Sequence, residues 1–154
     1  MNRSSSQGRD RGPQQSRGLS ADEQAQLDRI VKEGDALTTI TWADTIGQSL
    51  VQNNLTTSQI RNFFGEVRQI QLAWEQDDNA AFRRAVLLIP KIGYHARRAR
   101  GSAQRGMAEL ERVLVPGLET VATAKPDQRK TYYTNFVDFF EAILAYHKKH
   151  GGRD

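Results

Sequence analysis

The chain has 154 residues, no cysteine and a formal net charge of +4, with 22 lysines and arginines against 18 aspartates and glutamates. This length suffices for one hydrophobic core but not for two, and the absence of cysteine excludes disulfides, thiolate metal sites and a cysteine nucleophile. Because it has no secretory signal and no run near the roughly 20 apolar residues of a membrane helix, we expect a soluble, cytoplasmic protein.

Residues 1–18 consist mainly of serine, arginine, glutamine and glycine. Such a segment buries too little surface to offset the entropy of ordering it, so we predict a disordered basic tail. Its arginines could add diffuse attraction to nucleic acid, although a solvated tail explains them equally well. We expect residues 19–150 to form one helical-bundle domain.

Two helices are predicted at the start of this domain. Ser20 followed by Glu23 has the spacing of a capping box, and the apolar pattern behind this pair stops at Gly34. Thr41 is the expected N-cap of the second helix, which should end at the turn-forming asparagine pair 53–54.

The third predicted helix has the clearest pattern. Thr56 and Gln59 again have capping-box spacing. The apolar residues that follow at helical spacing are Ile60, Phe63, Phe64, Val67, Ile70 and Trp74. This stripe indicates a long amphipathic helix.

A strongly basic segment follows. Residues 79–108 carry a net charge of +7 without one aspartate or glutamate, whereas residues 19–78 have a net charge of −6, from ten acidic and four basic side chains. The seven cations are Arg83, Arg84, Lys91, Arg97, Arg98, Arg100 and Arg105. Uncompensated positive charge among aromatic residues indicates a polyanionic partner. A solvated surface without a partner is the alternative that the sequence leaves open.

The basic segment also has the pattern of a helix. Four of its cations recur every seven residues, namely Arg84, Lys91, Arg98 and Arg105. On one helix they would stand about 10 Å apart along a single edge. Pro90 lacks an amide hydrogen and should kink or interrupt the helix. The pair 101–102 should end it, which leaves Arg105 in a loop or on the next helix.

Two more helices are expected in the C-terminal third. The fifth begins near Met107, with a pattern that resumes after the pair 116–117. The sixth follows residues 125–127 and has a wide apolar arc, which includes Tyr132, Tyr133, Phe136, Phe139, Phe140, Ile143, Leu144, Tyr146 and His147. Such a helix is central in a bundle or shared between a core and a partner. Because no segment has strand-like alternation, we predict an all-α fold, a compact bundle of about five or six helices.

The sequence shows no recognisable active site. It has no phosphate-binding glycine loop and no nucleophile elbow. His147 and His150 are three residues apart, but two histidines near a frayed helix end without a clustered carboxylate rarely hold a catalytic metal. Contact with phosphate or a base is a better interpretation of His95, which stands among cations. We expect no enzymatic activity, no metal and no cofactor.

Three sequence blocks together resemble one known family. They are residues 55–64 (LTTSQIRNFF), 87–98 (LLIPKIGYHARR) and 136–148 (FVDFFEAILAYHK). In composition, order and spacing they resemble the small subunit of the type III-A CRISPR effector, the Csm complex. The resemblance covers residues 55–150, and the three blocks together are more specific than any one of them.

The resemblance implies a helical bundle without catalysis of its own, acting in antiviral defence. Copies of that small subunit stack head to tail beside the backbone subunits that carry the guide RNA, and their basic faces line the target-RNA channel. The expected partners are therefore the target RNA and guide RNA duplex, other copies of the chain, and the backbone and large subunits, with no membrane.

The predicted RNA-binding residues come from two sources. The resemblance carries over four of them, Arg61 in the first block and Lys91, Arg97 and Arg98 in the second. Charge pattern alone adds Arg68, Arg84, Arg100 and Arg105. A subunit used at every position along a target should bind phosphate and sugar rather than base edges.

A helix-turn-helix DNA-binding regulator is the main alternative. A short polar turn separates the second and third predicted helices, and the third begins with polar residues that could face DNA, namely Thr57, Ser58, Gln59, Arg61 and Asn62. Against this alternative, the third helix is strongly apolar as far as Trp74, and the densest charge lies on another helix. A structural interaction protein with solvated cations is the third possibility.

Overall fold

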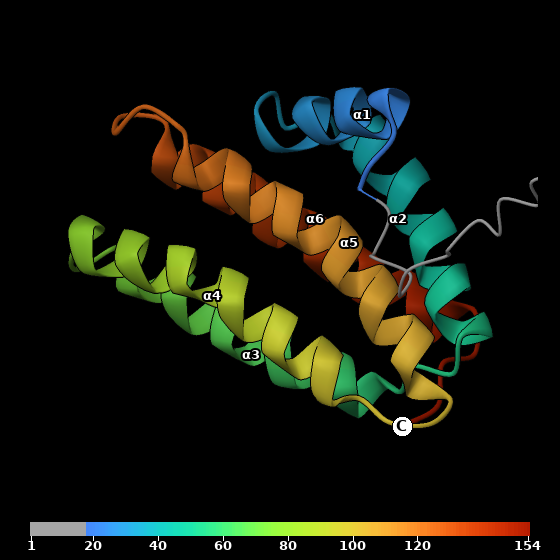
Figure 1. The fold of residues 1–154 in the computed structure, drawn as a ribbon. Coiled ribbons are helices and arrows are strands. Elements are labelled where there is room, and N and C mark those ends of the chain that lie inside the picture. The colour runs from blue at the N-terminus through green and yellow to red at the C-terminus, as the bar shows by residue number, and fades with distance from the viewer. Residues whose placement is uncertain (1–17) are drawn as a thin grey trace, which may run out of the picture.

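The computed structural model describes residues 18–154, which form six α-helices and no strand (Figure 1). The helices are α1 (Ala21–Val31), α2 (Ala36–Gln52), α3 (Thr57–Ala73), α4 (Asp78–Arg98), α5 (Ala103–Ala122) and α6 (Arg129–Lys149). The predicted all-α bundle is confirmed over these residues. The tail predicted at 1–18 lies outside the described residues except for Gly18.

Helix α6 is the central element of the bundle and packs against α1, α2, α3 and α5. Its fully buried aromatic residues are Tyr133, Phe136, Phe139 and Phe140. Trp42 of α2 stacks on Phe139, and Trp74 stacks on Tyr133 at the end of α3, with ring centroids 5.4 and 4.9 Å apart. The wide apolar arc therefore forms the core, while Tyr132, Leu144 and Tyr146 at its edges are half-buried.

Helices α3 and α4 run antiparallel, side by side, on one flank of the bundle (Figure 1). The start of α3 consequently lies beside the end of α4. The C-terminus comes back to the same end, where the carbonyl of Arg153 accepts a hydrogen bond from the backbone N–H of Thr57 at 2.7 Å. This end of the bundle brings together three segments that are far apart in the sequence, the start of α3, the end of α4 and the C-terminus.

Two predicted helix starts are confirmed and one is wrong. Ser20 and Thr56 form complete capping boxes with Glu23 and Gln59. Helix α2, however, begins at Ala36 with Asp35 as its N-cap, whose side chain accepts from the backbone N–H of Thr38 at 3.0 Å. Thr41 lies inside the helix, and its hydroxyl donates to the carbonyl of Leu37.

The two prolines do not interrupt their helices. Helix α4 continues through Pro90, and α5 continues through Pro116 without the break expected at residues 116–117. Pro90 is exposed, so water can reach the carbonyl that it leaves unpaired. The expected stop at residues 101–102 is confirmed, because α4 ends at Arg98 and Arg105 lies on α5.

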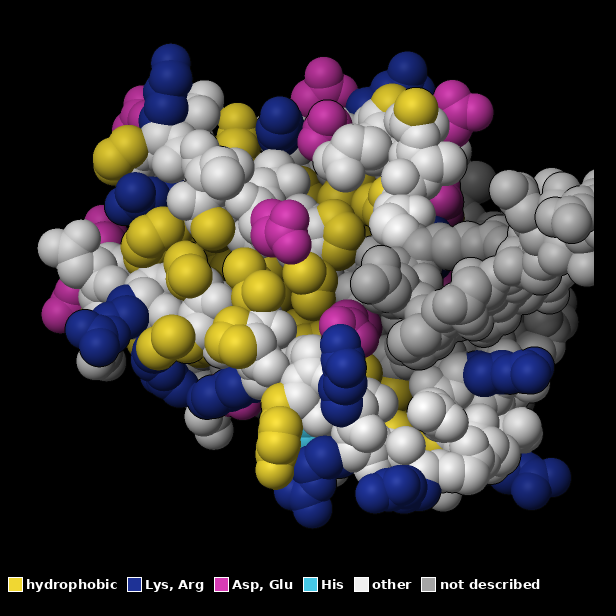
Figure 2. All heavy atoms as spheres, viewed as in Figure 1, with side chains coloured by type: hydrophobic (Ala, Val, Ile, Leu, Met, Phe, Trp, Pro, Cys, Tyr) yellow, Lys and Arg dark blue, Asp and Glu magenta, His cyan; other side chains and the backbone are white. Residues whose placement is uncertain are grey.

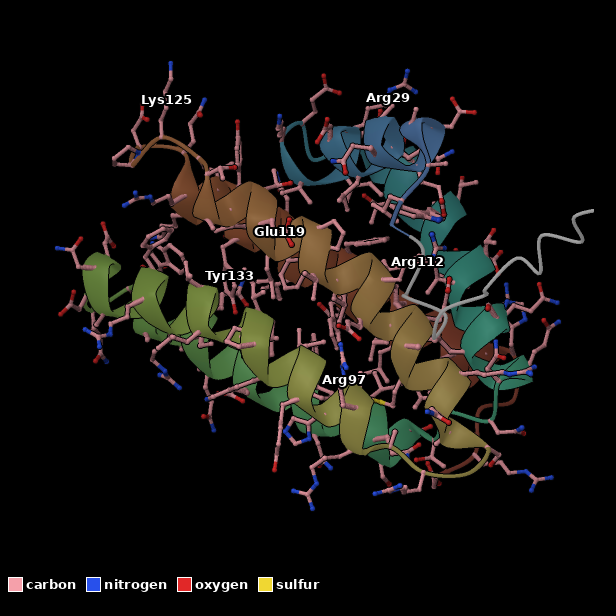
Figure 3. All side chains as sticks on the ribbon, viewed as in Figure 1. Arg29, Arg97, Arg112, Glu119, Lys125 and Tyr133 are labelled. Carbon is pink, nitrogen blue, oxygen red and sulfur yellow. The ribbon has the colours of Figure 1, made fainter. Side chains whose placement is uncertain are left out.

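One arginine fastens α1 to α5. The guanidinium of Arg112 on α5 donates to both carboxylate oxygens of Glu23 at 3.0 and 2.9 Å, and also to Glu109 (Figure 3). Glu23 Oε1 additionally accepts the backbone N–H of Ser20. The hydrogen bonds from Arg112 lower the pKa of Glu23 from its usual 4.5 to about 2, against the opposing effect of burial. Glu23, which takes part in the capping box of α1, thus also attaches α1 to α5.

Arg112→Ala should lower the free energy of unfolding by about 1 to 3 kcal/mol near neutral pH, because two partly buried carboxylates lose their shared donor. Since the folded-state pKa of Glu23 lies below the unfolded-state value, its stabilisation is complete above pH 4.5 and disappears as the pH falls toward about 2. Urea unfolding of both proteins across this range should show stability curves that converge on acidification. A gap that stays constant would contradict the assignment.

Gly47 lets α2 and α6 approach closely. A Cβ atom at Gly47 would lie 2.7 Å from Cβ of Tyr146 and 2.8 Å from the backbone nitrogen of His147. Gly65, in the middle of α3, has no such neighbour within 4 Å. The two helical glycines therefore differ in what surrounds them.

Gly47→Ala should destabilise the protein by about 1 to 3 kcal/mol, because backbone must move to make room. Gly65→Ala is the matched control and should stabilise it by about 0.5 to 1 kcal/mol, since alanine loses less entropy in a helix. Chemical denaturation of the two variants checks both signs. Shifts in the same direction would show that Gly47 is not a packing requirement.

Candidate nucleic-acid interface

The eight predicted RNA-binding residues are all exposed, but they do not share one face. Arg61 and Arg68 are on α3, Arg84, Lys91, Arg97 and Arg98 are on α4, Arg100 is in the turn after α4, and Arg105 is on α5. Helix α4 and the α4–α5 connection therefore carry most of the set. Figure 2 shows Lys and Arg side chains along this edge of the molecule, bordering hydrophobic side chains over α4 and α5.

Three of these cations follow the edge of α4 that faces α3. Arg84, Lys91 and Arg98 stand at seven-residue intervals on one uninterrupted helix. Lys91 Nζ lies 2.7 Å from Glu66 Oε1 of α3, and Arg98 lines a pocket together with residues of α3. Arg105 does not continue this row, because α4 ends before it.

Arg97 occupies a different edge of α4. Its side chain projects toward α5 (Figure 3), so Arg97 and Arg98 lie on either side of the outer ridge of the helix. The exposed Tyr94 stands one turn earlier, and its hydroxyl accepts a hydrogen bond from Arg98 at 3.2 Å. The end of α4 thus presents two guanidinium groups and a phenol ring together.

Arg61 and Arg68 lie apart from this group. At 100° per residue, both stand on the side of α3 opposite to Gln59 and Glu66, which face α4. Partial burial and the charge of Glu141 raise the pKa of Asp138 on α6, while the charge of Arg68 opposes them. The structure therefore does not bring the two α3 arginines into the row on α4.

Acidic neighbours are scarce around the eight residues. Within residues 18–154, Lys91 is the one member of the set with a carboxylate at salt-bridge distance, that of Glu66. This pair is exposed, so its net contribution to stability is small. Its effect on a polyanion is to withhold one positive charge from the row.

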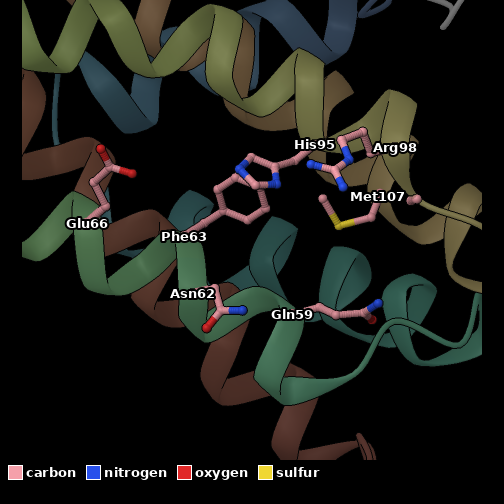
Figure 4. Close-up of a pocket in the computed structure, with 8 residues that line it drawn as sticks. Gln59, Asn62, Phe63, Glu66, His95, Arg98 and Met107 are labelled. Atoms are coloured by element: carbon pink, nitrogen blue, oxygen red, sulfur yellow. The ribbon is translucent and has the colours of Figure 1, made fainter.

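A pocket of about 260 Å³ opens where the start of α3 meets the end of α4 and the start of α5 (Figure 4). Its lining residues are Gln59, Asn62, Phe63, Glu66, His95, Arg98, Ala99 and Met107. The ring of His95 meets that of Phe63 edge to face, with centroids 4.9 Å apart. Planar groups of α4 therefore form one wall, and polar side chains of α3 form the other.

Several polar atoms of this pocket have no partner within residues 18–154. Gln59 uses its carbonyl oxygen to cap α3 through Thr56, which leaves its amide NH₂ free. Asn62 forms no side-chain hydrogen bond with these residues, and both Asn62 and His95 are exposed. The pocket thus offers uncommitted donors and acceptors beside a planar ring.

Sequence patterns could have identified this pocket in part. Gln59, Asn62, Phe63 and Glu66 have the spacing of one helix face, but Gln59 was explained by its capping role and Phe63 by the core. The missing information was which face of α4 lies opposite. That pairing depends on long-range packing.

The start of α3 is poorly suited to reading DNA. Thr57 is fully buried, and Gln59 is held by the capping box. The helix-turn-helix interpretation thereby loses the side chain of Thr57 and the carbonyl oxygen of Gln59.

His147 and His150, the two histidines considered as metal ligands, contact different groups. His147 is buried with Nε2 2.6 Å from the carbonyl oxygen of Leu55, and His150 pairs with Asp44. Among residues 18–154 no three His, Asp or Glu side chains are grouped as a metal site. None of the six helices combines the length and apolar character that a membrane crossing requires.

Comparison with known families agrees with the resemblance found in the three sequence blocks. The family described as Csm2 Type III-A matches residues 33–153, which include α2 to α6 and the whole basic segment. No curated protein and no solved structure matches the chain. Since the match covers most of the sequence, the chain belongs to the Csm2 family and is the small subunit of a type III-A CRISPR (Csm) complex.

Proposed function

We propose that this subunit is a non-catalytic RNA-binding component, which holds target RNA along the guide through sequence-independent phosphate contacts. The observation that carries the proposal is the surface of α4 and the α4–α5 connection. Six of the seven cations in residues 79–108 have no acidic side chain at salt-bridge distance within the described part of the chain. Positive groups left free of internal partners are available to a polyanion.

Phosphate contact suits a subunit that must accept any target sequence. Guanidinium and ammonium groups bind phosphate through charge and counterion release, and they carry no base information when they do so. Arg97 and Arg98 stand on adjacent edges of one helix end, where a strand crossing that end could meet both. We propose these two, with Lys91 and Arg100, as the principal contacts.

Exposed apolar residues beside the cations support protein partners as well. Leu87 and Tyr94 on α4 are 48% and 58% exposed, and Figure 2 shows a broad hydrophobic area over α4 and α5. Large exposed apolar areas mark interaction surfaces. We propose that copies of the subunit, each one domain over residues 19–150, stack in the cytoplasm as a minor filament beside the backbone and large subunits.

Replacing Lys91, Arg97 and Arg98 by alanine should weaken RNA binding about equally for unrelated sequences. If about four phosphates are neutralised, the logarithm of affinity for the wild type should fall with the logarithm of salt at a slope near −3, and the variant should have a shallower slope. Fluorescence anisotropy with labelled single strands of several sequences measures both quantities. Arg29→Ala/Lys125→Ala removes two cations that lie away from the Arg97 end of α4 (Figure 3) and should change neither appreciably.

Three outcomes would contradict the proposal. If the triple-alanine variant lost affinity for one RNA sequence and kept it for another, the three residues would read bases instead of phosphates. An equal effect of Arg29→Ala/Lys125→Ala would show that net charge alone governs binding. If the wild type has no salt-sensitive affinity for RNA, the cations are a solvated surface and the subunit is a structural one.

Glu66→Gln should strengthen RNA binding, because it releases Lys91 from its 2.7 Å ion pair. Because Lys91 is already counted among the four wild-type contacts, affinity should rise while the salt slope stays near −3. Glu75→Gln is the matched control: it removes the same charge from the end of α3, where Glu75 pairs with Lys130. Equal gains in the two variants would mean that Lys91 has no special place in the interface.

A further inference from the structure

We infer that the pocket between the start of α3, the end of α4 and the start of α5 receives one unpaired nucleobase of the bound RNA strand. This assignment rests on the proposed RNA-binding function and adds a base contact to the phosphate contacts. Its basis is the juxtaposition of planar, cationic and uncommitted amide groups around one small opening (Figure 4).

The size of the pocket limits its occupant. A volume of about 260 Å³ is at or below the lower end of the range for sites that enclose drug-sized ligands. One heteroaromatic base fits this space, and the sugar and phosphate of the same nucleotide would remain outside. They would then lie near Arg98, which lines the pocket, and the neighbouring Arg97.

The wall on α4 has the groups that stack on bases. The His95 ring meets the rings of Phe63 and Tyr94 edge to face, with centroids 4.9 and 5.8 Å apart, and the residue is exposed, so part of the ring is accessible. The guanidinium of Arg98 lies 5.5 Å from the ring centre of Tyr94 and is fixed there by a hydrogen bond. Aromatic rings and arginine planes are the usual stacking surfaces for unpaired bases.

The wall on α3 supplies hydrogen bonds without demanding one base. Within the described part of the chain, Asn62 has a carbonyl oxygen and an NH₂ without partners, and Gln59 adds a second such NH₂. A side-chain amide is both donor and acceptor, so it can pair with an edge of any of the four bases. The pocket is therefore compatible with binding that is independent of sequence.

A gap left by imperfect packing would differ from this pocket. Such gaps are apolar and closed, because unpaired polar groups are costly away from water. Here Asn62 and His95 are exposed, and Arg98 stands at the same opening. The polar groups remain solvated until a ligand replaces the water.

The test compares two strands that have the same charge. Anisotropy titrations of the full chain use a labelled oligouridylate and an abasic ribose-phosphate strand of equal length. The abasic strand should bind about 10-fold more weakly, since stacking one base contributes about 1 to 3 kcal/mol. Asn62→Ala/His95→Ala should lower affinity for oligouridylate alone, and its salt slope should stay that of the wild type, because no lysine or arginine is removed.

Gln69→Ala is the control on the same helix. Gln69 is exposed, lies seven residues from Asn62 and does not line the pocket, so affinity for both strands should stay unchanged. Circular dichroism of each variant should show the wild-type helix content, since all three altered residues are on the surface.

Each result separates the pocket from the phosphate interface. Equal affinity of the wild type for both strands overturns the base pocket and leaves the phosphate contacts intact. Equal weakening of both strands by the double variant overturns it too. Failure of both strands to bind the wild type would instead refute the proposed RNA-binding function itself.

A competition titration with a mononucleotide completes the test. Uridine monophosphate should not displace oligouridylate at concentrations near the dissociation constant of the strand, because it has one phosphate and lacks the neighbouring contacts. Displacement at such concentrations would reassign the pocket to a free nucleotide and contradict the inference.

Discussion

The burial of α6 at the centre of the bundle is the constraint on which the rest of the structure depends. Its aromatic residues require cover on several sides, and α1, α2, α3 and α5 supply it. Helix α4 packs instead on α3 and α5 and keeps a broad outer surface. That surface is where the chain can place arginine and lysine without burying charge. The core thereby determines which helix can carry the basic interface.

Charge is separated along the chain in a way that keeps this surface positive. The acidic residues concentrate before α4, where Glu23 fastens α1 to α5 through Arg112 and Asp35 caps α2. Glu66 is the exception, because it reaches Lys91 across the α3–α4 contact. Glu23 and Asp35 therefore stabilise the scaffold, and Glu66 moderates the interface directly.

Local features were predictable from the sequence, and long-range ones were less so. The capping box at Thr56 is a contact between near neighbours, so its spacing sufficed. Thr41 was misleading because Asp35 caps the helix earlier, and Pro90 does not interrupt α4 because an exposed helix face tolerates a missing hydrogen bond. The pocket needs the end of α4 to meet the start of α3, a pairing that no local pattern encodes. Whether Arg61 and Arg68 join the interface depends on a partner as well as on the fold.

Ultraviolet crosslinking of target RNA within the assembled effector complex, followed by peptide mapping on this subunit, tests the central claim most directly. We expect crosslinks to concentrate on peptides of α4 and the α4–α5 connection, residues 78–105, and on the start of α3 beside them. Crosslinks confined to α1, α2 or the outer side of α6 would contradict the account, because the RNA would then follow a surface that the cations of α4 do not reach.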